Sequence, residues 1–171
     1  VCFRSCSYND PDFLVLALIS RVFDDGFTSR LQRVLREERG LVYSVECRAT
    51  SMSDLGTMDF DVTVRPEKVV EVSRILLQEI KTFATEGPTE SELAHIKKRY
   101  FFDLDSELDD PYKQVVRYAF PHLYSIEMSL QEERELIESI TAKKMMEVAE
   151  KVFEAKNLNL ILVGPYTSEL K

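Results

Sequence analysis

The sequence predicts an α+β fold, in which one antiparallel-type sheet carries helices packed on one of its faces. Two segments alternate apolar and polar residues with a period of two, as strands with one wet face do. Several other segments repeat apolar residues at helical spacing and together outweigh the strands. No linker divides these elements, so we expect residues 1–171 to form a single domain.

A strand and two helices are expected before the first hairpin. Residues 2–8 would form the strand, and the turn over 9–12 combines Asp with Pro, which suit the start of a helix. The helix over 13–23 is apolar nearly all round, which is typical of a buried helix. Ser29 and Gln32 have the spacing of a capping box and would open a second, short helix.

A hairpin is expected after Gly40, which is suited to end the short helix in a left-handed conformation. In the strand over 41–50, simple alternation places Tyr43 on the same face as Val45 and the other apolar residues. The strand over 57–65 alternates in the same way. The two strands together predict an antiparallel pair with one buried and one wet face.

Five further helices and a closing strand are expected in the rest of the chain. The helices are opened by Pro, by a capping residue or by helical spacing alone. Their expected starts are Pro66, Thr89, residue 112, Ser129 and Thr141. The stretch over 112–125 is the least regular, and we expect it to break near Pro121. Residues 157–163 would form the final strand, ended by Gly164.

Charge and hydropathy exclude two classes of partner. The 22 Lys and Arg residues against 30 Asp and Glu residues give a formal net charge of −8. Phosphate backbones attract cationic proteins, so we expect no nucleic-acid partner. No stretch approaches the roughly 18 apolar residues of a membrane-spanning helix, so we expect no membrane partner either.

Cysteine usage bears on the compartment. Three cysteines, Cys2, Cys6 and Cys47, make an odd number, which favours free thiols in a reducing compartment over a disulfide framework. With no targeting segment visible, this favours a cytoplasmic location. We expect the thiols to be buried as small hydrophobes. Because the chain begins with Val1 inside an expected strand, we interpret it as a piece of a longer protein.

The residues supply no catalytic constellation of their own. The chain has no glycine-rich phosphate loop, no G-x-S-x-G motif and no H-x-x-E-H motif. The two histidines, His95 and His122, are far apart in sequence, and each is expected to be solvated. The carboxylates over 103–110 have the mixed spacing of a solvated acidic face. We therefore expect no catalytic residue and no metal site in this chain.

One stretch carries a family resemblance. It reads GFTSRL over 26–31 and continues as LREERGLVYSV over 35–45. The spacing T-x-x-E-L-x-x-x-K recurs from Thr89 to Lys97, and V-G-P closes the last expected strand at 163–165. In this order, and over essentially the whole chain, the sequence resembles the pitrilysin/insulysin and mitochondrial-processing-peptidase family of zinc metallopeptidases. One departure lies at 24–26, where Asp-Asp-Gly replaces small or glycine residues.

The resemblance implies that this chain is the C-terminal-type, inactive half of a larger peptidase. Such proteins resemble two related halves that enclose a chamber, one of which carries zinc on an H-x-x-E-H motif. The zinc would then lie in the parent chain or in a partner half, and the partners would be that half and a peptide substrate. This half would bind the peptide without hydrolysing it.

The resemblance also implies two substrate-binding residues, Arg36 and Tyr43, which lie seven positions apart. A guanidinium can donate two hydrogen bonds to a peptide carbonyl and keep its charge. A phenol can donate to the oxyanion that develops during peptide hydrolysis. Two plainer roles stay open at this point: Arg36 could form an ordinary surface salt bridge, and Tyr43 could be a core tyrosine.

Two other functions fit the same sequence. The parent could be a structural or assembly subunit that kept the fold and lost the chemistry, since fold alone does not fix function. The chain could also be an independent peptide-binding or dimerising module, with a homodimer of this fragment as one form, because a free sheet edge can recruit a partner strand.

Overall fold

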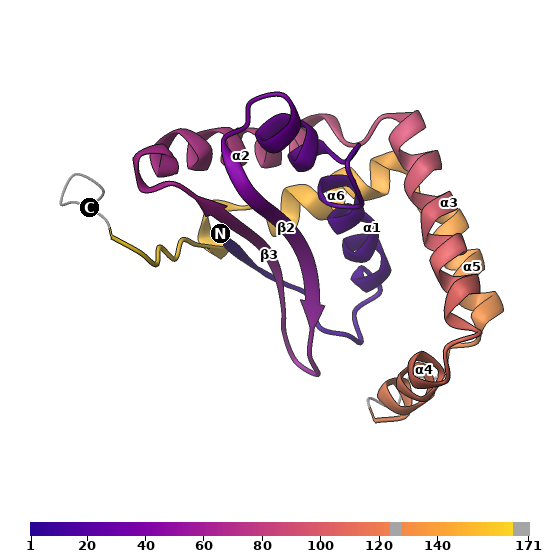
Figure 1. The fold of residues 1–171 in the computed structure, drawn as a ribbon. Helices are drawn as coiled ribbons and strands as arrows, with labels where there is room; N and C mark the ends of the chain where they lie inside the picture. Colours follow the sequence, from indigo (N-terminus) through magenta and orange to yellow (C-terminus); the bar gives the residue numbers. More distant parts are fainter. Residues whose placement is uncertain (124–127, 166–171) are drawn as a thin grey trace.

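A computed structural model describes residues 1–123 and 128–165 and has the predicted α+β architecture. In these residues a four-stranded antiparallel sheet has the strand order β2-β3-β1-β4 (Figure 1). The strands are β1 (Cys2–Ser5), β2 (Val42–Ser51), β3 (Gly56–Val64) and β4 (Leu158–Asn159). The helices are α1 (Phe13–Phe23), α2 (Val69–Glu86), α3 (Glu90–Glu107), α4 (Pro111–Leu123), α5 (Leu130–Ser139) and α6 (Ala142–Val152). Three short turns are η1 (Gln32–Glu37), η2 (Pro66–Lys68) and η3 (Ala155–Asn157).

The sheet has one buried and one exposed face, as the alternation predicts. Met58 and Phe60 of β3 are buried on the helix side, and Phe60 pairs with the buried Cys47 of β2. On the open face, Arg48 of β2 lies 3.0 Å from a carboxylate oxygen of Asp61 on the neighbouring strand. This separation places the apolar area against the helices and leaves the charged cross-strand pair in water.

Aromatic side chains join the sheet to the helices. The ring of Phe23, at the end of α1, lies 5.2 Å from that of Phe60 in β3 and 5.0 Å from that of Phe83 in α2. Phe153, which follows α6, packs 5.0 Å from Phe3 of β1. Such rings bury large apolar areas, so α1, α2 and the sheet share one continuous core.

Several predicted helix starts are confirmed. Thr89 and Glu92 form the full capping box of α3, and Ser129 and Glu132 form that of α5. The hydroxyl of Thr141 accepts a hydrogen bond from the backbone N–H of Lys144 and so caps α6. These side chains satisfy amide donors that the first turn of a helix cannot pair internally.

The predicted capping box at Ser29 and Gln32 is wrong. The hydroxyl of Ser29 donates to the backbone carbonyl of Gly26 at 2.7 Å, and the Gln32 amide turns away to bind other partners. The segment that follows is the π-helical turn η1 rather than an ordinary α-helix. Local spacing alone predicts the α-helical start, whereas tertiary partners for Gln32 decide against it.

The first and the last strand of the sequence, β1 and β4, are shorter than predicted. Instead of 2–8, β1 ends at Ser5, because its partner β3 begins at Gly56, directly opposite. Instead of 157–163, β4 covers Leu158–Asn159, because no strand lies beside the residues that follow in the described part of the chain. Strand propensity is present in both segments, but a strand needs a paired neighbour.

The predicted break at Pro121 is also wrong. Pro121 lies inside α4, which continues to Leu123. Proline removes one backbone donor, its own N–H, so α4 continues past Pro121 with one internal hydrogen bond fewer. The last two residues of the predicted stretch, 124 and 125, lie outside the described residues.

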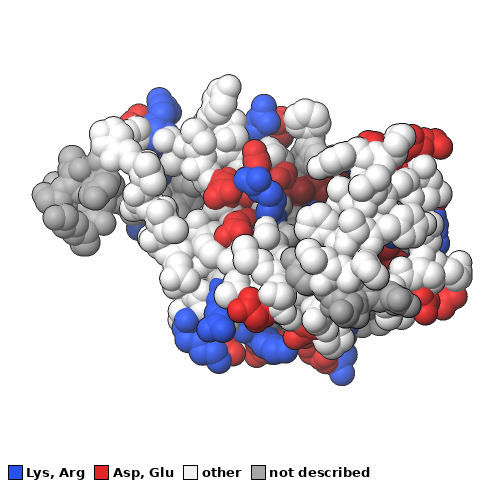
Figure 2. All heavy atoms as spheres, turned by 90° about the horizontal axis from the view of Figure 1, so that it is seen from below, with Lys and Arg blue, Asp and Glu red and all other residues white. Residues whose placement is uncertain are grey.

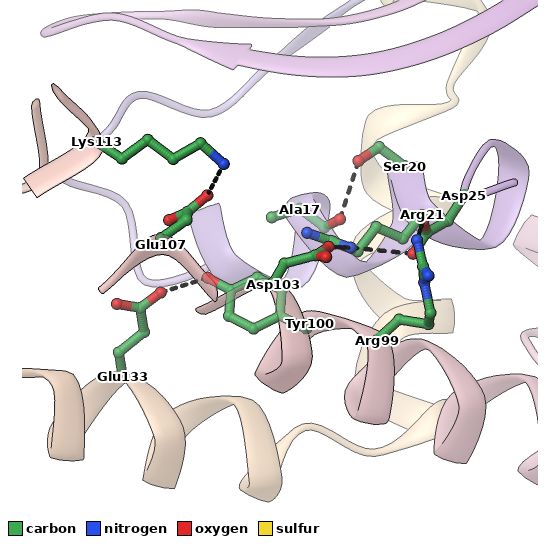
Figure 3. A network of polar contacts seen from close by, with 10 residues as sticks. All are labelled: Ala17, Ser20, Arg21, Asp25, Arg99, Tyr100, Asp103, Glu107, Lys113 and Glu133. Atoms are coloured by element: carbon green, nitrogen blue, oxygen red, sulfur yellow. Dashed lines mark hydrogen bonds and ion pairs between the residues drawn. The ribbon is translucent and has the colours of Figure 1, made fainter. Parts of the chain in front are cut away.

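A polar network fastens α3, α4 and α5 to one another and to α1 (Figure 3). Arg21 of α1 donates to Asp103 of α3 at 2.7 Å, and its guanidinium lies 5.1 Å from the Tyr100 ring. Tyr100 donates to the buried carboxylate of Glu133 on α5, which also accepts from Arg117 of α4 at 2.6 Å. Burial and Glu133 raise the pKa of Tyr100, so its hydroxyl stays protonated and keeps donating.

The same network changes the interpretation of the 103–110 carboxylates. The sequence predicts a solvated acidic face there, but Asp103 pairs with Arg21 and Glu107 pairs with Lys113 at 3.4 Å. Part of this acidic run therefore holds helices together. On the face shown in Figure 2, basic and acidic side chains are interspersed. None of the described helices is long and apolar enough to cross a membrane.

An ion pair between Arg30 and Glu92 gives the first testable prediction. Burial alone would raise the pKa of Glu92, but hydrogen bonds from Arg30 and Thr89 lower it to about 2. A carboxylate whose pKa falls on folding stabilises the native state above its ordinary pKa and loses that effect as the pH falls. We expect Glu92→Gln to lower the free energy of unfolding by about 1–3 kcal/mol at pH 7. The difference should shrink between about pH 5 and pH 2 in urea titrations.

Glu132→Gln is the matched control for this variant. Glu132 occupies the same capping-box position in α5, and its carboxylate binds Ser129 with no ion pair among the described residues. Glutamine preserves a capping box, so the control should change the free energy of unfolding by about 0.5 kcal/mol or less. Equal losses in the two variants at pH 7 would show that capping, not the ion pair, carries the effect.

Candidate functional site

The candidate site is the junction where η1 turns into β2. Arg36 belongs to the last turn of η1, and Tyr43 is the second residue of β2. Both side chains are exposed. The structure therefore brings the two predicted residues to one short segment at the surface, and the path of that segment decides how they are presented.

A tight turn fixes the junction. The N–H of Leu41 donates to the carbonyl of Leu35, and the N–H of Gly40 donates to the carbonyl of Arg36, each at 2.9 Å. Gly40 has a φ of 58°, a left-handed conformation that glycine adopts without strain. The Gly40 bond, which spans four residues, is the αL pattern that ends a helix in a defined direction. Because Leu35 is fully buried, the turn is anchored in the core.

The π-helical geometry of η1 separates its buried and exposed residues. The N–H of Glu38 donates to the carbonyl of Arg33, five residues earlier, at 2.9 Å. Val34 and Leu35 are buried, whereas the next residue, Arg36, lies at the surface. Short π-helical turns are rare and occur often at functional sites. Here the turn places the Arg36 guanidinium in solvent directly after two core residues.

A β-bulge turns Tyr43 outward. Val42 pairs with Val64 and Ser44 pairs with Thr63, so Tyr43 is the extra residue between two consecutive pairs. Its side chain is 84% exposed, although Val45 on the predicted shared face is 1% exposed. The predicted inward orientation of Tyr43 is therefore wrong, because a bulge breaks the strict alternation of a strand. The alternative interpretation of Tyr43 as a core tyrosine is therefore wrong as well.

Arg36 does not form the surface salt bridge that the sequence allowed as its alternative role. Its guanidinium lies 6.0 Å from the centroid of the exposed Phe27 ring, and it has no ion pair among residues 1–123 and 128–165. The neighbouring Arg33, by contrast, lies 3.6 Å from Glu38. A guanidinium against an aromatic face keeps its outer N–H groups available as donors.

Asp24 supports the site, although sequence reasoning did not assign it a role. One carboxylate oxygen accepts from the side-chain amide of Gln32 and the other from the backbone N–H of Cys47, both at 3.1 Å. Gln32 also donates to the carbonyl of Val45 at 2.9 Å. These bonds join the end of α1, η1 and β2. The only sequence signal was that an acid stands where the resembling family has small residues.

Arg30 anchors the loop before η1. Its guanidinium forms two hydrogen bonds to the carboxylate of Glu92, at 2.7 and 2.8 Å, and one to the carbonyl of Gly87 at 3.0 Å. It also lies 5.3 Å from the Phe83 ring. A two-pronged pair of this kind fixes orientation as well as distance. The S-R-L motif at 29–31 thus ties this loop to the start of α3.

The thiols and histidines are not arranged for chemistry. Cys47 is buried as predicted, and burial together with Asp24 raises its pKa, so the thiol stays protonated. Cys2 and Cys6 are only partly buried. His95 and His122 are exposed, on α3 and α4. Within the described ranges no three His, Cys, Asp or Glu side chains are grouped to hold a metal, so these residues do not fit a zinc site.

Comparison with known proteins connects this geometry to a family. Residues 1–100 match the family described as the peptidase M16 inactive domain. Over 155 residues the chain is 26% identical to an uncharacterized zinc protease of Mycobacterium tuberculosis, an alignment that covers 90% of this chain and 35% of that protein. The chain thus spans about a third of the length of this relative.

Solved structures share the fold. A peptidase M16 inactive domain from Pseudomonas fluorescens superposes with a TM-score of 0.82 at 21% identity, over 91% of this chain and 38% of that one. A protease from Helicobacter pylori gives a TM-score of 0.86 at 16% identity, over the same share of each chain. With residues 1–100 matched and the fold shared, this chain belongs to the inactive-domain family of the M16 zinc proteases.

Proposed function

We propose that this chain is the substrate-binding half of a zinc metallopeptidase and that a separate H-x-x-E-H half supplies the metal and the general base. The observation that carries the proposal is the outward position of Tyr43 at the bulge in β2, together with the exposure of Arg36 seven residues earlier. A buried Tyr43 or an Arg36 held in an ion pair would have contradicted this proposal. The family membership supports the same role.

The two side chains suit complementary tasks. The Arg36 guanidinium can donate two hydrogen bonds to a carbonyl of an extended peptide and hold it in place. The Tyr43 hydroxyl can donate to the oxyanion that forms when water attacks the scissile carbonyl. Zinc in the other half would activate that water and polarise the carbonyl. Neither residue breaks a bond by itself, so this half orients and stabilises.

The supports of the site favour pre-organisation over flexibility. Asp24 and Gln32 fix the start of β2, and Arg30 fixes the loop before η1 through Glu92. Donors aimed in advance at a developing charge need no rearrangement during the reaction. Side chains built on such a supported frame keep the geometry that catalysis needs more closely than side chains on a free loop.

The Arg36 role predicts a loss of catalytic efficiency. In the assembly of this chain with its catalytic half, we expect Arg36→Ala to lower kcat/KM for peptide hydrolysis roughly 10–1,000-fold. Arg33→Ala is the matched control, because Arg33 lies in the same turn, is exposed and pairs with Glu38. Its kcat/KM should stay within about twofold of the unmodified assembly.

The Tyr43 role predicts a loss that depends on the hydroxyl alone. Tyr43→Phe keeps the ring and removes the donor, so we expect kcat to fall roughly 10–1,000-fold with little change in KM. Tyr112→Phe on α4 is the control, since Tyr112 is also a largely exposed tyrosine and belongs to another element. Circular dichroism should show an intact fold in every variant.

Near-normal turnover in both site variants would remove the assigned roles. An assembly that hydrolyses no peptide, and whose other half carries a degraded H-x-x-E-H motif, would instead establish a structural or assembly subunit. Loss of activity in the Arg33 or Tyr112 controls as well would indicate a general disturbance rather than a lost contact.

A further inference from the structure

The loop between α1 and η1 carries the departure from the family motif, Asp-Asp-Gly at 24–26. Glycine at these positions would leave the loop many backbone conformations. The structure shows that both acids are bonded instead. Asp24 joins the loop to η1 and β2, and Asp25 accepts hydrogen bonds from Arg21 at 3.0 Å and from Arg99 at 3.1 Å (Figure 3). The first part of the loop is therefore held by charged hydrogen bonds to three other elements.

The second part of the loop is closed by a tight turn around Phe27. Gly26 has a φ of 86°, in the left-handed region that glycine adopts without strain. Its carbonyl accepts from the backbone N–H of the buried Ser29 at 3.1 Å and from the Ser29 hydroxyl at 2.7 Å. The next residue, Arg30, is paired with Glu92. Bonds on both sides therefore fix the backbone that carries Phe27.

The Phe27 ring lies beside the Arg36 guanidinium. The exposed fraction of Phe27 is 72%, so the loop backbone rather than core packing directs its ring. The guanidinium carbon of Arg36 lies 6.0 Å from the ring centroid, at the outer limit of the distance at which an aromatic face attracts a cation. Arg36 has no ion pair among the residues that the structure describes, so no carboxylate competes with the ring for its guanidinium.

This contact restricts Arg36 without using its donors. A phenylalanine has two side-chain torsions, whereas an arginine has many rotamers, so the ring can limit the positions of the guanidinium at little entropic cost to itself. The five N–H groups of a guanidinium lie in its plane, and an aromatic ring attracts it through its charge. The N–H groups on the outer edge of Arg36 thus stay available to a peptide carbonyl.

We propose that Phe27 is a positioning residue for Arg36, held in place by the bonded loop over 24–30, and that it aims the Arg36 guanidinium before a peptide binds. The proposal rests on the peptide-binding role proposed for Arg36. Phe27 acts through Arg36 and touches no reacting atom. The acids at 24 and 25 then have a function: they replace a flexible loop by one that fixes the ring.

The chemical shift of the Arg36 side chain tests the contact without any activity. An N–H group that lies over an aromatic ring is shifted upfield by the ring current. We expect the Arg36 Nε–H signal of the unmodified chain to lie upfield of the same signal in the Phe27→Leu variant. Phe102→Leu is the matched control, because Phe102 is 66% exposed and belongs to α3, and it should leave the signal unchanged.

The loop is tested by the same signal. Asp25→Ala removes the hydrogen bonds from Arg21 and Arg99, so the Phe27 ring should become more mobile and the upfield shift of Arg36 should decrease. Asp61→Ala is the control, because Asp61 also accepts from an arginine but lies on the open face of the sheet. It should leave the Arg36 signal where it is.

Kinetics in the assembly of this chain with its catalytic half test the consequence. We expect Phe27→Leu to lower kcat/KM for peptide hydrolysis about two- to fivefold, the effect of one exposed contact between a cation and an aromatic ring. Phe27→Tyr keeps the aromatic face and should stay within about 1.5-fold of the unmodified assembly. In the Arg36→Ala background, Phe27→Leu should change kcat/KM by less than about 1.5-fold, because a positioning residue has no effect without the residue that it positions.

Four outcomes would overturn the proposal. An unchanged Arg36 Nε–H signal in Phe27→Leu would show that the ring does not hold the guanidinium. An unchanged signal in Asp25→Ala would show that the loop does not hold the ring. An equal loss from Phe27→Leu with and without Arg36 would assign Phe27 a contact of its own with the peptide. Weaker affinity between the two halves, with normal turnover at saturation, would assign the ring to their interface.

Failure of the proposed function gives a different result. Normal turnover in Arg36→Ala would remove the peptide-binding role of Arg36, and with it the kinetic effect of Phe27. The upfield shift of the Arg36 signal would still decide whether Phe27 holds the guanidinium.

Discussion

Burial of one face of the hairpin β2–β3 against α1 is the constraint on which the rest of the structure depends. Phe23 at the end of α1 packs between Phe60 of the sheet and Phe83 of α2, so three elements meet at one side chain. Because aromatic rings of this size dominate core energetics, the positions of α2 and the sheet relative to α1 are fixed together. The surface segments are attached to elements whose positions this contact fixes.

The site shows how a rigid frame can hold exposed donors. Arg36 and Tyr43 are in solvent, but the residues that carry them are tied down by partly buried polar groups. Asp24 bonds to both η1 and β2, and Arg30 bonds to Glu92 at the start of α3. Buried polar groups stabilise a structure only when they find partners, so these bonds both satisfy the groups and fix the frame. The two exposed side chains then keep their full hydrogen-bonding capacity.

The strands toward the two edges of the sheet differ in how far they are paired. The hairpin β2–β3 is long and paired along its length except at its bulge, whereas β1 is paired over a few residues and borders an apolar groove. The candidate site lies on β2, and residues 61–64 of β3, which line the groove, pair directly with that strand. The two regions are therefore separated by a single strand, β3.

The sequence by itself determined the α+β class, the hairpin and the capping boxes at Thr89 and Ser129, because these follow from patterns within a few residues. It also determined the family, because the family's motifs occur in order along the chain. It also singled out Arg36 and Tyr43. Only the tertiary structure decided that Tyr43 points outward, since a bulge depends on the register against β3. The same holds for Gln32, whose partners Asp24 and Val45 come from other elements, and for the length of β4. Local propensity selects what a segment can be, and long-range pairing selects where it stops and which way its side chains face.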